Sequence, residues 1–538
     1  PWPRPDIALN NETGHAAVGP ALAMCSSFTR ASLFCIGQYM PAPHNGACNA
    51  CRFFPMNEPS FAAAGRTPLR GPFRFRAAFG FLGVTSAVAL LAGCASLVLP
   101  DSRLPQTPVP SAWSVQPPSG SAGLAQPVTP LAQWWQRFND PQLTQLVTQT
   151  LQSNTSLRSA QASLQQARAQ VDVQSAGLLP SVGTSASAQR SRASNNTGSS
   201  FQAGFDASWE PDVFGRLRSG VSASAADAQA AEASLADVQV SLAAETAVNY
   251  IELRGLQQRL AIARSNLASQ QETLQITQWR LQAGLTTSLV SEQARAAAEQ
   301  TAAQIPVLES SLAQSRHSLA VLTGQAPLAL DGLLADSVAV PQPAQDLALA
   351  IPAETLRQRP DVRAAEQRIA AALARVSQAD AARYPDFRIS GNLGLRALTV
   401  GALTNGSSIA SALLASVSMP LMDGGAARAQ VRVQEAALEQ ARVGYEASVL
   451  TALKDVEDAL VALRGDRERL VRLQAAADAA GNAALLAQQR YSSGLIDFQS
   501  VLETQRTLLS TQDSLAATVA SISADHVRLY KALGGGWQ

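Results

Sequence analysis

The sequence has few of the residues that build metal centres and disulfide frameworks. Its 538 residues include five cysteines and four histidines, and every cysteine lies within the first 94 positions. Beyond them only His317 and His526 remain, more than 200 residues apart, and we interpret both as structural. This distribution argues against a cysteine-ligated metal, a disulfide framework or a multi-histidine centre in the rest of the chain.

Charged and aromatic side chains are also scarce. Charged residues make up 15% of the chain and aromatic residues 5%, whereas an average soluble domain is roughly 25% charged. The 41 basic residues nearly balance the 40 acidic ones, which gives no reason to expect a nucleic-acid partner. We find no nucleotide-binding Gly-rich loop, nucleophile–base pair or metal signature in the sequence, so we expect a protein that is not an enzyme and has no cofactor.

The N-terminal region contains a candidate lipoprotein signal peptide, which we place at residues 56–93 because Met56 is a plausible start. Arginines precede an apolar run, 77–92, that has the length of a signal-peptide core and is short for a membrane span. The run ends in Leu91-Ala92-Gly93-Cys94, which resembles a bacterial lipobox. We therefore expect cleavage before Cys94 and a covalent lipid on its sulfur, since a thiolate is the nucleophile that accepts the lipid.

The residues on either side of this signal suggest two more interpretations. We interpret residues 1–55 as upstream sequence outside the working protein, and Cys48-Asn-Ala-Cys51 as a pair without the second half of a metal site. Ala95 stands where an Asp would retain a lipoprotein in the inner membrane, so lipoprotein sorting favours the outer membrane. The alternative is a lone buried cysteine behind an uncleaved signal anchor.

The remaining chain contains two copies of one sequence pattern, and such an internal repeat is the main indication of the fold. Residues 157–161 (LRSAQ) are echoed 205 positions later by residues 362–366 (VRAAE). Further along, Gly284-Leu285 is echoed 210 positions later by Gly494-Leu495. Because the order of the echoes is kept, each unit is predicted to contain a helix, two strands, a long helix, a tight turn and another long helix.

The longest segments of each unit are predicted to be helical. Residues 215–282 and 424–492 are mostly Ala, Gln, Leu, Glu and Arg, with apolar residues recurring at threes and fours. Some 65 helical residues span about 100 Å at 1.5 Å per residue. A helix of that length requires a packed helical array, and an ordinary soluble coiled coil is the simplest alternative.

Strands of about ten residues separate the helices. Apolar and polar residues alternate along residues 201–211 and 386–396, and more weakly along 180–190 and 408–420. Ten alternating residues suit a tilted transmembrane strand, although a soluble sheet covering a core is an alternative. Four strands cannot close a barrel, because about eight is the smallest natural closed set. If the strands span a membrane, several copies of the chain must share one barrel.

This plan resembles the outer membrane factor family, whose best-known member is TolC. The motifs that resemble its NodT-type lipoprotein branch are the lipobox, Trp134-Trp135 with Asp140-Pro141-Gln142-Leu143, Gln358-Arg359-Pro360-Asp361-Val362, and the C-terminal residues 530–537. The resemblance implies a mainly α protein with a small β part. It further implies a homotrimer of duplicated helix–β-hairpin–long-helix units, with a twelve-stranded outer-membrane β-barrel, four strands per chain, continued by a periplasmic α-helical barrel.

The resemblance also implies a domain organisation and partners. The domains would be a lipidated Pro-rich tether (94–130), a first repeat (131–323), an equatorial segment (324–360) and a second repeat (361–538). The expected function is a passive exit duct for drugs or other small molecules in the bacterial outer membrane. An inner-membrane resistance–nodulation–division pump would drive export through a periplasmic adaptor. The alternatives are type I protein secretion and a non-conducting envelope coiled-coil lipoprotein.

In this family the tunnel closes at its periplasmic tip, which points to a candidate gate. Glycine tolerates positive φ in the tight turn of a helical hairpin. The matching turns here are Gly284-Leu285 and Gly494-Leu495. Threefold symmetry would turn one inward acid into a ring of three. The candidate gate residues are Glu503 and Asp497 for such a ring, and Arg490 and Tyr491 for hydrogen bonds between helices; each is alternatively an ordinary residue at a helix end.

Overall fold

The computed structural model describes residues 105, 113, 131–193, 196–343 and 353–535. The chain divides into two compact units, residues 1–94 and 95–538, and all described residues belong to the second. The segments 1–55 and 56–93, the lipobox Leu91-Ala92-Gly93-Cys94 and nearly all of the expected tether lie outside the described residues. The same holds for the end of the C-terminal motif.

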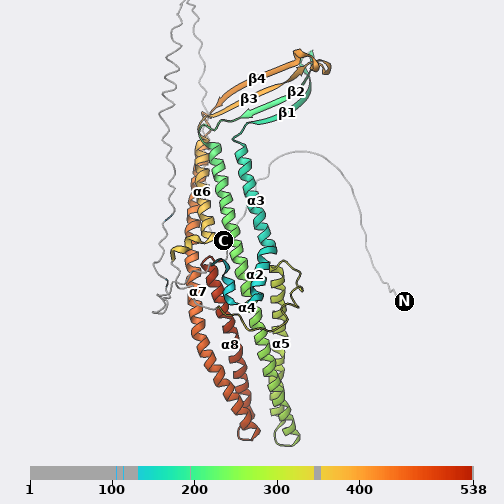
Figure 1. The fold of residues 1–538 in the computed structure, drawn as a ribbon, viewed down its shortest axis with the longest axis vertical. Helices are drawn as coiled ribbons and strands as arrows, with labels where there is room; N and C mark the ends of the chain where they lie inside the picture. Colours follow the sequence, from blue (N-terminus) through green and yellow to red (C-terminus); the bar gives the residue numbers. More distant parts are fainter. Residues whose placement is uncertain (1–104, 106–112, 114–130, 194–195, 344–352, 536–538) are drawn as a thin grey trace, which may run out of the picture. The chain divides into compact units, whose positions relative to one another are not determined.

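The second unit is mainly helical with one small antiparallel sheet, which confirms the predicted fold class (Figure 1). Short 3-10 helices lie at Leu131–Phe138, Ala353–Gln358, Val400–Thr404 and Gly406–Ser408. The helices are α2 (Pro141–Ser153), α3 (Thr155–Ala176), α4 (Arg216–Gln282), α5 (Ser288–Leu322), α6 (Pro360–Ala381), α7 (Ala426–Ser492) and α8 (Phe498–Ala532). The strands are β1 (Ser181–Ala193), β2 (Asn196–Trp209), β3 (Asp386–Ala397) and β4 (Ile409–Ser418).

The element bounds repeat with the two offsets seen in the sequence. Helices α3 and α6 begin at positions 155 and 360, and strands β1 and β3 begin at 181 and 386, so both pairs keep the first offset. Helices α4 and α7 begin at 216 and 426, and α5 and α8 begin at 288 and 498, so both pairs keep the second. Helices α4 and α7 both contain 67 residues, and α5 and α8 both contain 35. The two repeats therefore share one fold, and each of these elements has an equivalent in the other repeat.

Polar side chains and proline fix where the helices begin. Asp140 caps α2 by accepting a hydrogen bond from the Leu143 backbone N–H at 2.9 Å. Asn154 caps α3 in the same way through Ser156. Pro360 occupies the first position of α6, where its missing N–H costs nothing. Two of the motifs noted in the sequence thus contribute helix starts.

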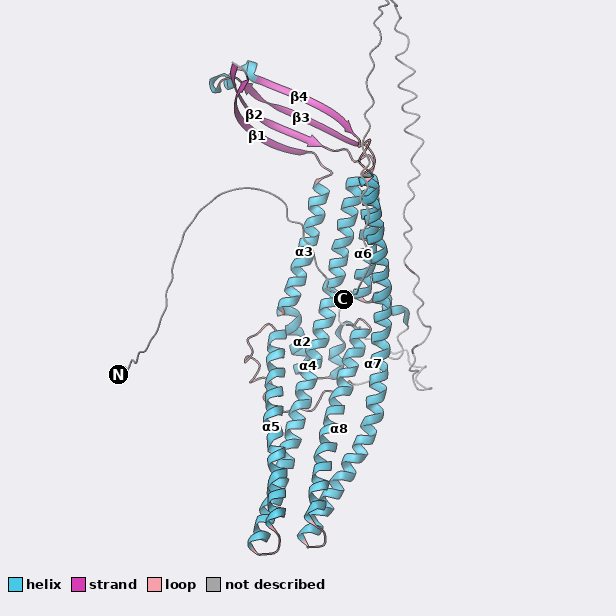
Figure 2. Cartoon of the chain, turned by 180° about the vertical axis from the view of Figure 1, so that it is seen from behind, coloured by secondary structure: helices cyan, strands magenta, loops and turns pink. Residues whose placement is uncertain are grey.

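The four strands form a sheet in the order β1-β2-β3-β4, with every neighbouring pair antiparallel (Figure 2). Residues directly opposite each other share a face, so the alternating apolar residues of β2, β3 and β4 lie on one side. The most exposed large side chains of this face include Phe205, Leu393, Leu413 and Val417, which are 56–83% exposed. A soluble sheet would bury such a face.

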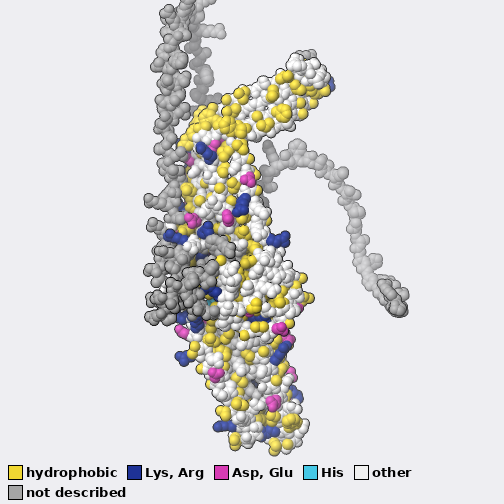
Figure 3. Space-filling model, viewed as in Figure 1, with side chains coloured by type: hydrophobic (Ala, Val, Ile, Leu, Met, Phe, Trp, Pro, Cys, Tyr) yellow, Lys and Arg dark blue, Asp and Glu magenta, His cyan; other side chains and the backbone are white. Residues whose placement is uncertain are grey.

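Large exposed apolar side chains also gather where the sheet meets the helices (Figure 3). Leu421 is 93% exposed and Met422 is 95% exposed, just after β4. Val213 and Phe214 lie at the corresponding place after β2 and are also exposed.

The helices pack along their lengths around two main apolar clusters. One joins Trp134 and Trp135 to α2, α4 and α8, with the Trp134 ring stacked on Tyr530 at 5.5 Å between centroids. The other joins α6 to α7 and α8 through residues such as Val362 and Tyr445. Apolar packing between helices thus holds the two repeats together.

One fully buried arginine ties the segment after α5 to the core. Arg254 of α4 donates hydrogen bonds to the Asp336 carbonyl oxygen at 2.6 Å, to Gln257 at 2.7 Å and to Gln142. Its equivalent in the second repeat, Arg464, is exposed, so the two repeats use this position differently.

Among the residues that the structure describes, no helix combines the length and the apolar composition needed to cross a bilayer.

Candidate functional site

The two helix-pair turns form the end of the helices farthest from the sheet (Figure 2). Gly284 and Gly494 have φ values of 70° and 74°, in the left-handed region that favours glycine. The backbone N–H of Leu285 donates to the Arg280 carbonyl oxygen, and that of Leu495 donates to the Arg490 carbonyl oxygen, both at 2.8 Å. These are the six-to-one bonds of a Schellman motif, which ends a helix sharply.

An apolar cluster joins the two hairpins near these turns. It brings α5 residues such as Ala294 and Ala297 against Tyr491 of α7 and Phe498 and Val501 of α8. The Tyr491 and Phe498 ring centroids are 5.4 Å apart. The tip therefore has its own small core, separate from the two main clusters.

A single arginine crosses from one hairpin to the other at the tip. Nη1 of Arg280, on α4, donates a hydrogen bond of 2.9 Å to the Tyr491 carbonyl oxygen on α7. The guanidinium of Arg280 also lies over the Tyr491 ring, 4.6 Å from its centroid. A hydrogen bond and a cation–π contact thus connect the first repeat to the second at this point.

The predicted gate residues occupy different environments. Asp497 is the N-cap of α8 and accepts hydrogen bonds from the backbone N–H of Ser500 at 3.0 Å and from its hydroxyl at 2.6 Å, which lowers the Asp497 pKa. Glu503 is exposed on α8, and Arg490 is exposed near the end of α7. Tyr491 is buried, and its hydroxyl has no hydrogen-bond partner, so its contacts use the ring and the backbone.

Arg280 was not among the residues singled out from the sequence. The repeat carries a signal that points to it, because Arg280 and Arg490 are 210 positions apart and each lies four residues before its turn glycine. In the structure Arg280 contacts Tyr491 on the other hairpin, whereas Arg490 is exposed.

A second feature is that one chain leaves unpaired strand edges and one long helix that is covered on one side only. Among the described residues, strands β1 and β4 each pair with one other strand and leave their second edge unpaired. Helix α4 lies between α3 and α5 of its own repeat and α6 and α8 of the second repeat. Helix α7, its equivalent, contacts α6 and α8 of its own repeat, and within this chain α3 and α5 do not complete its other side.

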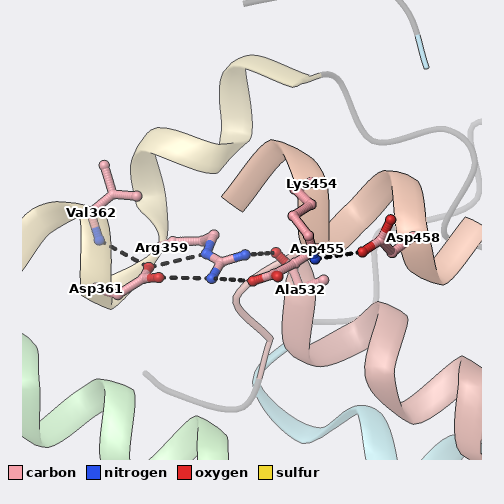
Figure 4. Close-up of polar contacts among 7 residues, drawn as sticks. All are labelled: Arg359, Asp361, Val362, Lys454, Asp455, Asp458 and Ala532. Carbon is pink, nitrogen blue, oxygen red and sulfur yellow. Dashed lines mark hydrogen bonds and ion pairs between the residues drawn. The ribbon is translucent and has the colours of Figure 1, made fainter. Parts of the chain in front are cut away.

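A charged cluster lies at the start of α6, in the Gln358–Val362 motif. Arg359 donates to Asp361 at 3.0 and 2.7 Å, to Asp455 at 3.3 Å and to the Ala532 carbonyl oxygen at 2.7 Å (Figure 4). These acidic partners raise the Arg359 pKa although burial opposes the shift. The described part of the chain contains no group of three or more metal-ligand side chains. The motif thus provides a clamp between α6, α7 and α8.

Comparisons with known proteins agree on one family. The family model described as "Outer membrane efflux protein" matches residues 146–325 and 351–535. The chain is 31% identical to Nodulation protein T of Rhizobium leguminosarum bv. viciae, covering 83% of this chain and 92% of that protein. It is 34% identical to the pyoverdine export outer membrane protein OpmQ of Pseudomonas putida, covering 80% and 94%. The solved structure of the outer-membrane channel OprN is similar with a TM-score of 0.74 at 35% identity, covering 81% of this chain and 100% of that one.

Proposed function

Because this chain belongs to the outer membrane efflux protein family, we propose that three copies of it close into one continuous exit duct. The protein is an outer-membrane efflux channel, and its family is one of ducts. The observation that supports the trimer is that a single chain leaves both edges of its sheet, at β1 and β4, unpaired and one side of α7 uncovered.

The sheet edges decide how many copies are needed. In lipid an unpaired strand edge leaves backbone groups without partners, each costing several kcal/mol, so the sheet must close. Two copies would supply eight strands, whose barrel interior is filled by side chains. Three copies supply twelve strands and leave a passage, so a conducting barrel favours the trimer.

The repeat predicts how the helices meet across copies. Helix α4 packs against α6 and α8 of the following repeat. If the repeats are equivalent around a ring, α7 packs in the same way against α3 and α5 of the next copy. Helices α7 and α5 both carry exposed apolar side chains, such as Val443 and Leu450 on α7 and Leu289 and Val307 on α5. Burial of these side chains would stabilise the assembly.

The same reasoning gives the strand register between copies. In one chain, Ala207 of β2 lies opposite Gly391 of β3. The equivalent of β2 is β4 and the equivalent of β3 is β1, so the two offsets of the repeat relate position 207 to 417 and position 391 to 186. Val417 of one copy would therefore lie opposite Ala186 of the next, and Ser416 opposite Ser187. This register keeps apolar residues on one face and polar residues on the other, as a strand pairing in a membrane requires.

We infer that the passage is closed at the end of the helices where the two hairpin turns lie. Arg280 holds the α4–α5 hairpin to the α7–α8 hairpin through Tyr491, so separating the hairpins would break this contact. Glu503 is exposed in the single chain and would form a ring of three acids if it faces the lumen. Asp497 would then act only as the N-cap of α8. The turns at Gly284-Leu285 and Gly494-Leu495 would form the surface that binds a periplasmic adaptor.

The remaining partners follow from the family. An inner-membrane resistance–nodulation–division pump would supply the energy, and the duct itself would be passive, carrying drugs or other small molecules. Cleavage before Cys94 and acylation of its sulfur would add a lipid anchor in the outer membrane. Cys94→Ser is expected to abolish incorporation of labelled palmitate, and persistent labelling would refute the lipobox assignment.

Conductance in planar bilayers tests the proposed duct. The purified protein is expected to form discrete channels at protein concentrations where it sediments as a trimer. A well-folded trimer that never conducts would support the non-conducting lipoprotein alternative and refute the duct. Export of a small dye from cells that carry the matching pump and adaptor, and its loss on deletion of this chain, separates efflux from protein secretion.

A further inference from the structure

Two arginines lie on the apolar face of the sheet, at the end farthest from the helices, which we call the outer end. Strand β1 begins soon after α3 and runs to the outer end, where it connects to β2 (Figure 2). The side chains of β1 on the apolar face are those of Val182, Thr184, Ala186, Ala188, Arg190 and Arg192. The last two are charged and exposed, although they continue a row of small and apolar side chains.

The strand register places both arginines where the apolar surface ends. Ala188 lies opposite Phe201 of β2, and the next two positions of β2 on this face are Ser199, opposite Arg190, and Thr197, opposite Arg192. The apolar face of β2 therefore runs from Phe201 to Trp209, about 27 Å along the strand at about 3.4 Å per residue. With strands tilted by about 40°, this is a height of about 20 Å, close to the apolar band of about 25 Å of an outer-membrane barrel.

No acidic residue neutralises the charge at the outer end. Residues 181–205 and 387–418, which contain most of the sheet and its outer connections, include four arginines and no aspartate or glutamate. Among the described residues, the side chains of Arg190 and Arg192 form no ion pair or hydrogen bond. By contrast, the arginines that follow the sheet at its other end are paired, Arg216 with Glu210 and Arg218 with Asp212.

A phosphate group that is attached to acyl chains matches this surface. The planar guanidinium group can donate two parallel hydrogen bonds to one phosphate. The aliphatic part of an arginine can lie on an apolar surface while its charged end reaches the polar headgroups. Phe205 and Leu393, on the same face, are 58% and 56% exposed and provide apolar surface for acyl chains. A free anion would use only the charge and would leave this apolar surface uncovered.

We propose that Arg190 and Arg192 bind the phosphate of a lipid in the outer leaflet of the outer membrane. The helices of an outer-membrane efflux channel are periplasmic, so the outer end of the sheet lies at the outer leaflet. The phosphate would accept hydrogen bonds from both guanidinium groups, and the acyl chains would lie along the apolar face of β1 and β2. The inference requires that this face contacts lipid, but it does not depend on conduction, on the pump or on the exported compound.

Native mass spectrometry of the purified full protein in a neutral detergent measures lipid binding directly. The probe is lipid A with its two phosphate groups, and the control is the same lipid after removal of both phosphates. We expect saturable binding of the phosphorylated form that weakens as NaCl is raised, because salt screens exposed charges. The dephosphorylated form should bind at least about tenfold more weakly, since a hydrogen bond between charged groups contributes roughly that factor. An excess of inorganic phosphate should leave most of the lipid bound.

Two double variants with equal changes of charge locate the site. Arg190→Gln with Arg192→Gln removes both charges from the apolar face and is expected to weaken lipid A binding at least about tenfold. Arg388→Gln with Arg396→Gln removes two charges from the polar face of the same sheet, where these exposed arginines lie opposite Ser416 and Gln202. This second variant is expected to bind lipid A as the unmodified protein does.

Three results would overturn the proposal. They are equal binding of lipid A with and without its phosphates, displacement of the lipid by inorganic phosphate, which would indicate a site for free anions, and equal losses in the two double variants. Sedimentation shows whether each variant assembles as the unmodified protein does. If the first double variant does not assemble, the single variants Arg190→Gln and Arg192→Gln, each with a smaller expected loss, replace it. Lipid binding without any channel conductance would refute the proposed duct and leave this inference intact.

Discussion

Replacing Arg280 tests whether the tip contact keeps the duct closed. Arg280→Ala removes the 2.9 Å hydrogen bond to the Tyr491 carbonyl oxygen and the cation–π contact at 4.6 Å. A hydrogen bond from a charged donor contributes about 1.5 kcal/mol at the lower end of its range, and a half-exposed cation–π contact contributes about 0.5 kcal/mol. A loss of about 2 kcal/mol from the closed state shifts the balance between closed and open tips by about 30-fold per chain.

The assay is single-channel recording in planar bilayers, with the open fraction as the readout. Arg490→Ala is the matched control, because Arg490 occupies the equivalent position in the second repeat and is exposed. We expect a large rise in the open fraction for Arg280→Ala and little change for Arg490→Ala. Equal effects of the two variants, or no effect of either, would refute the role given to Arg280.

Three further predictions concern the sheet, the lumen and the helical core. Gly204→Ala should sharply lower the yield of trimer extracted from membranes, because the new Cβ would lie 2.7 Å from the Gly394 Cα and 2.8 Å from the Leu393 carbonyl oxygen. Gly183→Ala is the control and should be tolerated, because the nearest atom to its new Cβ would be 4.0 Å away. Glu503→Gln should reduce cation selectivity, measured as a reversal potential closer to zero in a KCl gradient, while Glu299→Gln on α5 should not; unchanged selectivity would place Glu503 outside the lumen. Asp237→Asn should raise the unfolding temperature at pH 7. The Asp237 pKa is raised above 3.8 in the folded protein, so the ionised carboxylate lowers stability as the pH rises from 3.8 through that pKa. Below pH 3.8 the carboxyl group is neutral and the gain should vanish.

The repeated elements were predictable because their signals are local. The alternation along residues 201–211 and the long Ala- and Gln-rich segments need no tertiary information to indicate strand and helix. The expected helix 215–282 differs from α4 by a single residue at its start. The turn glycines were also identifiable, because a tight helical hairpin requires positive φ at one residue.

The contacts between distant segments were not predictable in this way. The partnership of Arg280 with Tyr491 joins residues 211 positions apart, and the sequence does not indicate which of the two equivalent arginines crosses to the other hairpin. Pro360 begins α6 and Asp361 lies in its first turn, but the contacts of Arg359 with Asp455 and α8 depend on how three helices pack.

Disulfide cross-linking between copies tests the shared barrel most directly. Ser187 of β1 and Ser416 of β4 lie on opposite edges of one sheet and out of register with each other. Their separation therefore exceeds three strand spacings, or about 14 Å, which is too far for a disulfide within a chain. A chain that carries Ser187→Cys and Ser416→Cys should oxidise to a covalent trimer on a non-reducing gel. Ser187→Cys with Ala412→Cys, shifted by four positions along the strand, should not. Absence of cross-linking in the first variant, or a ladder that ends at dimers, would contradict the three-copy barrel.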